Sequence, residues 1–356
     1  MSTVAADTGL RETALRLVQQ AGGYWETRDR KAYRDASGRG TVPLSARFLA
    51  DLALGYLAWG TMGENRGALE RLPPLVESIL ARQDVSGAFR WNLPDPGATH
   101  PGGVRDQVDL AMVLDTFGLL REHGILSPAL AQRAEKAGLR AAAWLESVRL
   151  PGRPDIIHKR VYEASPPPPV FDVLNGDALA ARAFARAAAL PGGERYAALA
   201  LPFLEHLAER FGRHQPGWWP YAETVETGAA CPPDRPVPTV FFQSMMILHL
   251  RGLEAVCPPL ASVLDAAAEA VAGAVDERGV IDERRESRHE CRGKPNVLVA
   301  DALRRRHPAR ALARLRRVAD RHLAADGGVC DEAGEPLEDK WRIWLFSDLA
   351  RLLLRE

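Results

Sequence analysis

The sequence predicts an all-α protein, an (α/α)6 toroid in which six helical hairpins form a single domain over residues 1–356. Two observations carry this prediction. Apolar residues recur at i, i+3, i+4 and i+7 along most of the chain, which is the spacing of amphipathic helices, and the alternation typical of strands is almost absent. A glycine followed by an aromatic or β-branched residue also recurs after alternate helices, which indicates a repeated hairpin.

Glycine, proline and capping residues set the ends of twelve expected helices. In chain order they span 9–21, 45–60, 66–83, 105–122, 127–147, 174–189, 193–212, 238–255, 259–275, 294–306, 308–324 and 339–354. Alternate helices are expected to be outer and inner, so that one hairpin recurs about every 50 to 65 residues. An open α-solenoid, a non-catalytic helical-repeat protein that binds other proteins, is the alternative, since helical repeats alone do not distinguish a ring from an arc.

The joints between hairpins carry the repeated glycine. They read Gly23-Tyr24-Trp25, Gly87-Ala88-Phe89, Gly217-Trp218-Trp219, Gly279-Val280-Ile281 and Gly328-Val329, with a longer degenerate form, LPGRPDIIHKRVYEASPPPP, after the fifth helix. We expect each glycine to take the left-handed position that ends a helix, and the following apolar residue to cover the exposed end of the ring.

The composition of the chain argues against several classes of function. Lys+Arg and Asp+Glu both number 46, so no net charge favours nucleic acid or an anionic membrane surface. The chain has no apolar run of about 20 residues that would span a bilayer, and its start resembles no secretory signal. We therefore expect a cytoplasmic protein without a membrane span or nucleic-acid partner. The four cysteines are too few for a disulfide scaffold and are expected to be reduced.

Between Phe171 and Glu223, the phrases VLNGDALAARAFA and GWWPYAE resemble an inner helix and a Gly-Trp joint of the α/α-toroid superfamily. That superfamily includes six-hairpin glycosidases and unsaturated glucuronyl hydrolases, and more distantly terpenoid cyclases and prenyltransferase β subunits. The resemblance covers nearly the whole chain as architecture. It implies a toroid and leaves the chemistry open, because one fold hosts unrelated reactions.

In such a ring, every joint from an outer to an inner helix emerges at the same end, which we call the mouth. The expected mouth loops are 22–44, 84–105, 149–173, 213–238, 276–295 and 325–340. Nearly every one combines carboxylates, a basic group and an aromatic residue. A saccharide site needs that mixture: carboxylates for proton transfer, aromatic faces for sugar rings, and basic groups for an anionic sugar.

The sequence therefore predicts a carbohydrate-active enzyme, a hydrolase or a lyase or epimerase, that needs no cofactor. Its expected substrate is a saccharide, and a uronate is one candidate. RDQVDLAMVLDTF followed by FDVLNGDALAARA is similar in layout to the two Asp-bearing inner helices of unsaturated glucuronyl hydrolases. The expected acid/base residues are Asp106, Asp109 and Asp172. The expected substrate-binding residues are Trp91, Arg105, Asn175, Trp218, Trp219, Tyr221, Glu223, Gln243, Arg292, Lys294, Trp341 and Arg342.

Three alternatives stay open. Asp106 or Asp172 can serve only as a helix cap. A terpenoid cyclase is disfavoured because the chain lacks a D-x-D-D motif and has only 7% aromatic residues to surround a carbocation. Zinc is the alternative cofactor, for a zinc-dependent transferase or cyclase, with ligands drawn from separate mouth loops. Its candidate ligands are Cys231, His289, Cys291 and Cys330.

Overall fold

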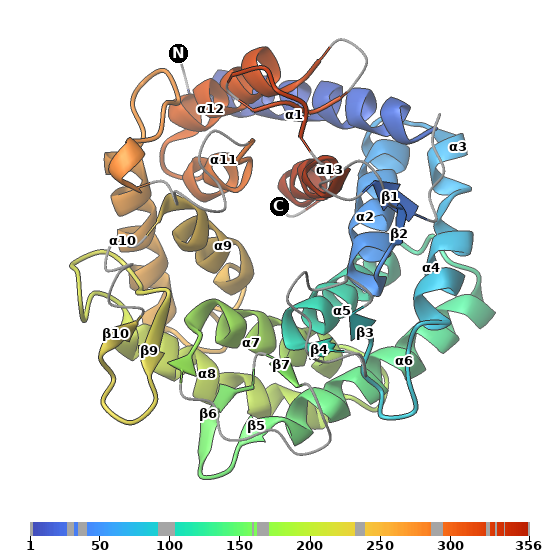
Figure 1. Ribbon diagram of the computed structural model, residues 1–356, viewed down its shortest axis with the longest axis vertical. Coiled ribbons are helices and arrows are strands. Elements are labelled where there is room, and N and C mark those ends of the chain that lie inside the picture. The colour runs from blue at the N-terminus through green and yellow to red at the C-terminus, as the bar shows by residue number, and fades with distance from the viewer. Residues whose placement is uncertain are drawn as a thin grey trace.

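A computed structural model describes the chain at residues 3–26, 32–34, 41–91, 104–158, 160–161, 171–231, 239–285, 295–324, 328–331, 333–337 and 339–354. Six helices form an inner ring, and the others surround it (Figure 1). The inner helices are α2 (Ala46–Met62), α5 (Gln107–Glu122), α7 (Leu174–Ala188), α9 (Val240–Leu250), α11 (Leu298–Leu303) and α13 (Asp339–Leu354). The outer helices are α1 (Thr3–Glu26), α3 (Arg66–Leu69), α4 (Leu72–Leu80), α6 (Pro128–Ser147), α8 (Ala197–Arg210), α10 (Pro259–Gly273) and α12 (Pro308–His322).

The ring is closed. The last inner helix, α13, packs against the first, α2, and the outer helices α1 and α12 lie side by side where the chain returns to its start. At Gly55 on α2, an added Cβ would lie 2.2 Å from the ring of Phe346 on α13, so these two helices approach closely. Closure confirms the predicted toroid and excludes the open solenoid.

Local sequence explains where the helices start. Ser45, Asp106, Ser127 and Thr239 each accept a hydrogen bond from a backbone N–H in the first turn of the following helix. Such caps satisfy N–H groups that have no partner within the helix. Prolines at the first positions of α6, α10 and α12 start helices in the same way, since those positions need no N–H donor.

Several predicted helix bounds were wrong. The first helix was expected over 9–21, whereas α1 spans Thr3–Glu26. The expected helix 66–83 is divided into α3 and α4, because Pro73 and Pro74 fit only the first turn of a helix. Helix α9 ends at Leu250 rather than at the expected residue 255. Gly252, two residues after this end, adopts a left-handed φ of 87°. Helix α11 is a single short element, Leu298–Leu303, within the expected 294–306.

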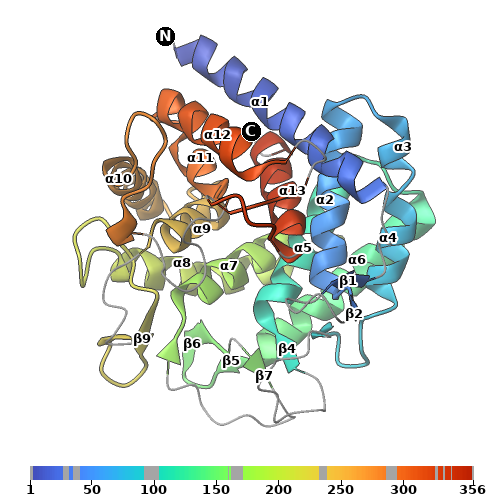
Figure 2. The same cartoon turned by 45° about the horizontal axis from the view of Figure 1, so that its top comes forward.

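Short strands, which the sequence pattern did not reveal, connect the joints at one end of the ring (Figure 2). They pair antiparallel as β1-β2, β3-β4-β7, β5-β6 and β10-β9-β8. Most pairs lie within one joint, whereas β4 with β7 and β8 with β9 link neighbouring joints. Their bounds are β1 (Ala32–Arg34), β2 (Thr41–Pro43), β3 (Arg90–Trp91), β4 (Val104–Asp106), β5 (Arg149–Leu150), β6 (Arg153–Ile157), β7 (Arg160–Val161), β8 (Phe171–Asp172), β9 (Ala222–Thr224) and β10 (Ala230–Cys231). Two 3-10 turns, η1 (Glu194–Tyr196) and η2 (Glu283–Arg285), complete the described elements.

The joint glycines are left-handed at three of the expected positions, with φ of 93° at Gly87, 83° at Gly217 and 76° at Gly279. These glycines lie in tight turns beyond the helices and do not themselves end the helices. Gly87, for example, lies in a turn whose flanking residues Gln83 and Phe89 form an antiparallel bridge. The expectation was wrong for Gly23, which lies inside α1. Phe89 is buried in the core, which explains why an apolar residue follows the glycine.

Among the described residues, no helix combines the length and apolar character needed to cross a bilayer.

Candidate functional site

Two clusters of carboxylates lie along the inner helices. We call the first the inner-ring cluster; it is formed by side chains of α2, α5 and α13, namely Arg47, Asp51, Asp109, Asp348 and Arg351. We call the second the between-ring cluster, because it connects inner helix α7 with outer helix α8. Its members are Asp155, Asp172, Asp177 and His206.

The inner-ring cluster is held together by two arginines. Arg47 Nη1 lies 3.5 Å from Asp109 Oδ1, and Arg47 Nε lies 3.6 Å from Asp51 Oδ2. Arg351 donates to Asp51 Oδ1 at 2.9 Å and lies 3.4 Å from Asp348 Oδ1. Solvent reaches part of this cluster, since the side chain of Arg47 is 21% exposed and that of Asp348 is 18% exposed.

Burial changes the acidity of two of these carboxyl groups. Desolvation raises the pKa of Asp109 to about 7, against the opposing attraction of Arg47 and with further repulsion from Asp106 and Asp51. Desolvation likewise raises the pKa of Asp348 to about 7, while Arg351 and Arg47 lower it and Asp51 raises it. Both groups therefore exchange protons near neutral pH, which is the property of a general acid/base.

Aromatic side chains border the same cluster. The Arg47 guanidinium lies over the Trp344 ring at 5.2 Å from its centroid, and Trp341 packs edge-on against Trp344 at 4.9 Å. Arg342 lies over the ring of Tyr24 and donates to its hydroxyl. Two predicted substrate-binding residues, Trp341 and Arg342, thus belong to the helix that also carries Asp348.

The predicted pair at the start of α5 separates into two roles. Asp106 accepts from Val108 N at 2.8 Å as the helix cap, and Arg105 donates to Asp84 at 2.8 Å in the joint that precedes it. Asp109, three residues on, reaches Arg47 instead. The observed role of Asp106 is therefore to cap the helix, and its acid/base role stays a prediction.

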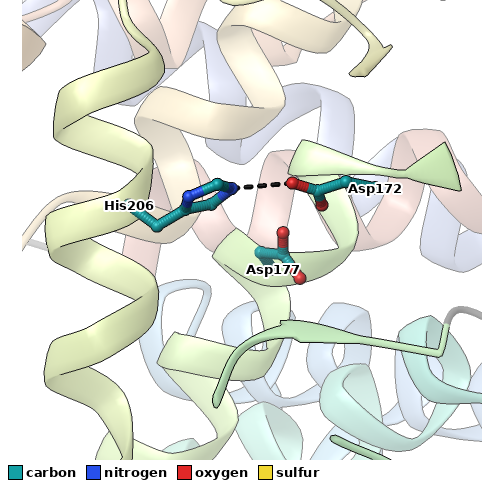
Figure 3. A group of neighbouring side chains, drawn as sticks. All are labelled: Asp172, Asp177 and His206. Carbon is teal, nitrogen blue, oxygen red and sulfur yellow. Dashed lines mark hydrogen bonds and ion pairs between the residues drawn. The ribbon is translucent and has the colours of Figure 1, made fainter. Parts of the chain in front are cut away.

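The between-ring cluster is more deeply buried. His206 Nε2 lies 2.7 Å from Asp172 Oδ2, and His206 Nδ1 lies 3.2 Å from Asp155 Oδ2 (Figure 3). Asp177 Oδ1 accepts from Ile157 N at 3.3 Å. Burial, and then the neighbouring Asp172, raise the pKa of Asp177 well above its usual value. Asp172 and Asp109 therefore belong to different clusters, whereas the sequence-based hypothesis paired them.

A cavity of about 280 Å³ borders this cluster on its Asp172 side. Glu223, a predicted substrate-binding residue, also lines it, and this carboxylate contacts His214 Nε2 at 2.6 Å and Arg210 Nη1 at 3.4 Å. Arg153 and Arg213 contribute further positive charge to its wall. The cavity is thus lined by both signs of charge rather than by apolar side chains.

Four other predicted residues, Asn175, Trp219, Tyr221 and Gln243, meet around a cavity of about 10 Å³. That volume suits a single water molecule and not a sugar ring. Gln243 joins the Gly-Trp joint to α9 by accepting from Trp219 N at 3.2 Å and donating to Gly217 O at 2.9 Å. The observed contacts of Gln243 are therefore structural.

The remaining candidates divide into observed and undescribed positions. Trp218 is buried beneath the Arg285 guanidinium, 4.6 Å from the ring centroid. The thiol of Cys330 donates to Arg321 O at 3.3 Å. The other candidates lie outside the described residues or have undescribed side chains: Trp91, Cys231, His289, Cys291, Arg292 and Lys294.

Sequence reasoning missed Arg47, Asp51, Asp348, Arg351 and His206. A signal existed for most of them. Asp51 lies four residues after Arg47, and Asp348 four residues after Trp344, so each pair shares one face of its helix. The polar residues on this face of otherwise apolar inner helices indicate that the ring interior is charged. His206 gave no such signal, because it lies on an amphipathic outer helix.

The sequence matches no protein-family model and no curated protein. The fold is similar to that of solved structures along nearly the whole chain. D-mannose isomerase has a TM-score of 0.68 at 12% identity, covering 99% of this chain and 98% of its own. Cellobiose 2-epimerase from Bacillus thermoamylovorans has a TM-score of 0.67 at 11% identity, covering 95% and 98%. Unsaturated glucuronyl hydrolase from Bacillus sp. GL1 has a TM-score of 0.66 at 15% identity, covering 97% and 96%.

These likenesses define the class by fold: the chain is an α/α toroid of six helical hairpins, as the resemblance of its sequence predicted. At such low identity they establish the architecture alone, because toroids host unrelated chemistry.

Proposed function

We propose that the protein is an enzyme that acts on a saccharide and that Asp109 is its general acid/base. The observation that carries this proposal is the position and acidity of Asp109. Its carboxyl group lies near the mouth end of an inner helix, its side chain is only 8% exposed, and its pKa is raised to about 7. A carboxyl group with this pKa can both donate and accept a proton at neutral pH.

The surroundings of Asp109 suit a sugar. Trp344 supplies an aromatic face of the kind that packs on pyranose rings, and Arg47 is a cation suited to the carboxylate of a uronate. Asp348 supplies a second carboxyl group with a raised pKa on α13, which packs against α2 as α5 does. Two such groups can divide the acid and base roles of hydrolysis, elimination or epimerisation.

The names of the structural neighbours support the substrate class. Among the solved toroids with similar folds are a mannose isomerase, a cellobiose epimerase and an unsaturated glucuronyl hydrolase. The proposal needs no cofactor, and it includes a cytoplasmic location and a small saccharide rather than a polymer as substrate.

The test is an activity survey of the full chain with mannose, cellobiose and unsaturated uronyl disaccharides, with products followed by NMR. We expect one of these substrates to be converted, and Asp109→Asn to lower kcat/KM by about 10²- to 10⁴-fold. Asp265→Asn is the matched control, because Asp265 lies on the outer helix α10, where its exposed side chain pairs with Arg306. Full activity in Asp109→Asn would overturn the proposed role, and no binding or turnover of any saccharide would overturn the function.

A further inference from the structure

Asp172, Asp177 and His206 bring three potential metal ligands together between α7 and α8 (Figure 3). One ligand atom from each side chain lies within 4.8 Å of the others. The three residues are 2%, 1% and 5% exposed, respectively. The saccharide proposal assigns no role to this group, and its burial calls for a compensating interaction.

Two oxygens of this group lack a hydrogen-bond partner. Asp172 Oδ1 and Asp177 Oδ2 are both buried, and neither accepts a hydrogen bond. The carboxylates of the inner-ring cluster, by contrast, face the guanidinium groups of Arg47 and Arg351. Neighbouring buried carboxylates with free oxygens are stable only with a proton or a cation between them.

The orientation of His206 favours a cation. Its Nδ1 lies 3.2 Å from Asp155 Oδ2, within reach of an N–H donor. Arg210 Nε donates to Nδ1 at 3.5 Å when that nitrogen carries no proton. With the proton on Nδ1, the lone pair of Nε2 points toward Asp172 Oδ2, 2.7 Å away. A carboxylate that fixes the far nitrogen of a histidine is the usual arrangement behind a metal-bound imidazole.

We propose that Asp172, Asp177 and His206 bind one Zn²⁺ ion, with Asp155 as the positioning residue for the imidazole. Zinc accepts mixed nitrogen and oxygen ligands in a tetrahedral site, whereas Ca²⁺ needs six to eight oxygens and Mg²⁺ retains several waters. Two carboxylates and a neutral imidazole also balance the charge of the ion. Tetrahedral ligands of zinc lie about 3.3 Å apart, so the contact between His206 and Asp172 would widen by about 0.6 Å.

The adjoining cavity gives the ion a route from solvent. It has a volume of about 280 Å³ and includes Asp172 in its wall. Such an entry path is one requirement of a metal site, and the cavity side leaves room for water as the fourth ligand. The site differs from the sequence-based zinc alternative, which relied on cysteines.

The test uses the full chain, stripped with EDTA, dialysed and titrated calorimetrically with ZnCl2. We expect one equivalent to bind. Asp177→Asn should weaken binding by on the order of 100-fold or more, and Asp155→Asn by about 10- to 100-fold. The matched control is Asp109→Asn, another buried aspartate near the start of an inner helix, which should bind zinc normally. Circular dichroism verifies that each variant is folded.

Replacing zinc with Co²⁺ gives a second readout on the unmutated protein. We expect the bound Co²⁺ to show the absorption spectrum of nitrogen and oxygen ligands without a thiolate band. This readout does not depend on whether any variant folds. Absence of zinc binding, a thiolate band, or binding that persists in folded Asp177→Asn and His206→Gln would overturn the proposal. The outcome is independent of saccharide turnover, because the control variant Asp109→Asn separates the two.

Discussion

The inner-ring and between-ring clusters use the same residue type at comparable places in the chain, and yet their surroundings differ. In the inner-ring cluster, carboxylates of three adjacent inner helices share Arg47 and Arg351, and solvent reaches part of the group. In the between-ring cluster, Asp172 turns toward His206 on an outer helix and is almost fully buried. The direction of each side chain therefore decides which chemistry is available to it.

Helical phase explains this difference. Asp109 lies within the first turn of α5, on the face that meets α2. Asp172 precedes α7 in strand β8, whose pairing with β9 directs the side chain toward the outer layer. Asp109 is the third residue of α5, whereas Asp172 lies two residues before α7, so the two carboxylates leave the chain at different points relative to their helices.

The largest expected effect concerns the arginine that distinguishes the inner-ring cluster. Arg351→Met would leave Asp51 without its 2.9 Å partner in a buried site and should lower the free energy of unfolding by about 3 to 5 kcal/mol. Urea denaturation measures this change. Arg284→Met, at an arginine that is 88% exposed, should change stability by less than about 1 kcal/mol. Equal effects of the two substitutions would show that the buried carboxylates do not depend on Arg351.

A smaller effect follows from the raised pKa of Asp109. The folded protein holds this proton up to about pH 7, while the unfolded chain releases it near the usual aspartate value of 3.8. Stability should therefore fall as pH rises between these values, and Asp109→Asn should remove that loss. We expect the variant to gain about 3 kcal/mol relative to the unmutated protein between about pH 5 and pH 8. Urea unfolding at both pH values measures the gain. If the difference in free energy of unfolding between the variant and the unmutated protein is the same at both pH values, the pKa of Asp109 is not raised.

The smallest expected effect separates Asp106 from its neighbour. Asp106→Ala removes the 2.8 Å bond to Val108 N and should cost about 1 kcal/mol, the usual value of a helix cap. The pH dependence assigned to Asp109 should persist. Thermal unfolding at several pH values tests both expectations, and loss of that pH dependence would mean that Asp106 titrates with the cluster.

Much of the fold follows from local sequence. The spacing of the apolar residues and the capping residues located the helices, and the recurrent glycine identified the joints. Both signals are local properties of the sequence: amphipathic spacing and left-handed turns. The sequence also contained the signal for the break between α3 and α4, since the adjacent Pro73 and Pro74 fit best in the first turn of a helix. The paired strands were not predicted, because segments of two to five residues are too short to show the alternation of a strand.

The candidate site was predictable only in part. The expectation of carboxylates near the inner-helix entrances included Asp109 and Asp172. It could not assign their partners, because ion pairs such as Arg351 with Asp51 join residues 300 positions apart. Gln243 illustrates the opposite case, where a polar residue in an apolar helix suggested a ligand contact and the structure shows it bonded to a joint.

The most direct test of the central claim is the acidity of Asp109 itself. Carboxyl-labelled aspartate can be followed by carbon NMR from about pH 4 to about pH 9, and the signal absent from Asp109→Asn identifies the residue. The account predicts that this signal titrates near pH 7, as required of an acid/base group in the inner ring. Titration near the ordinary aspartate value of 3.8 would contradict it and leave Asp109 as a structural partner of Arg47.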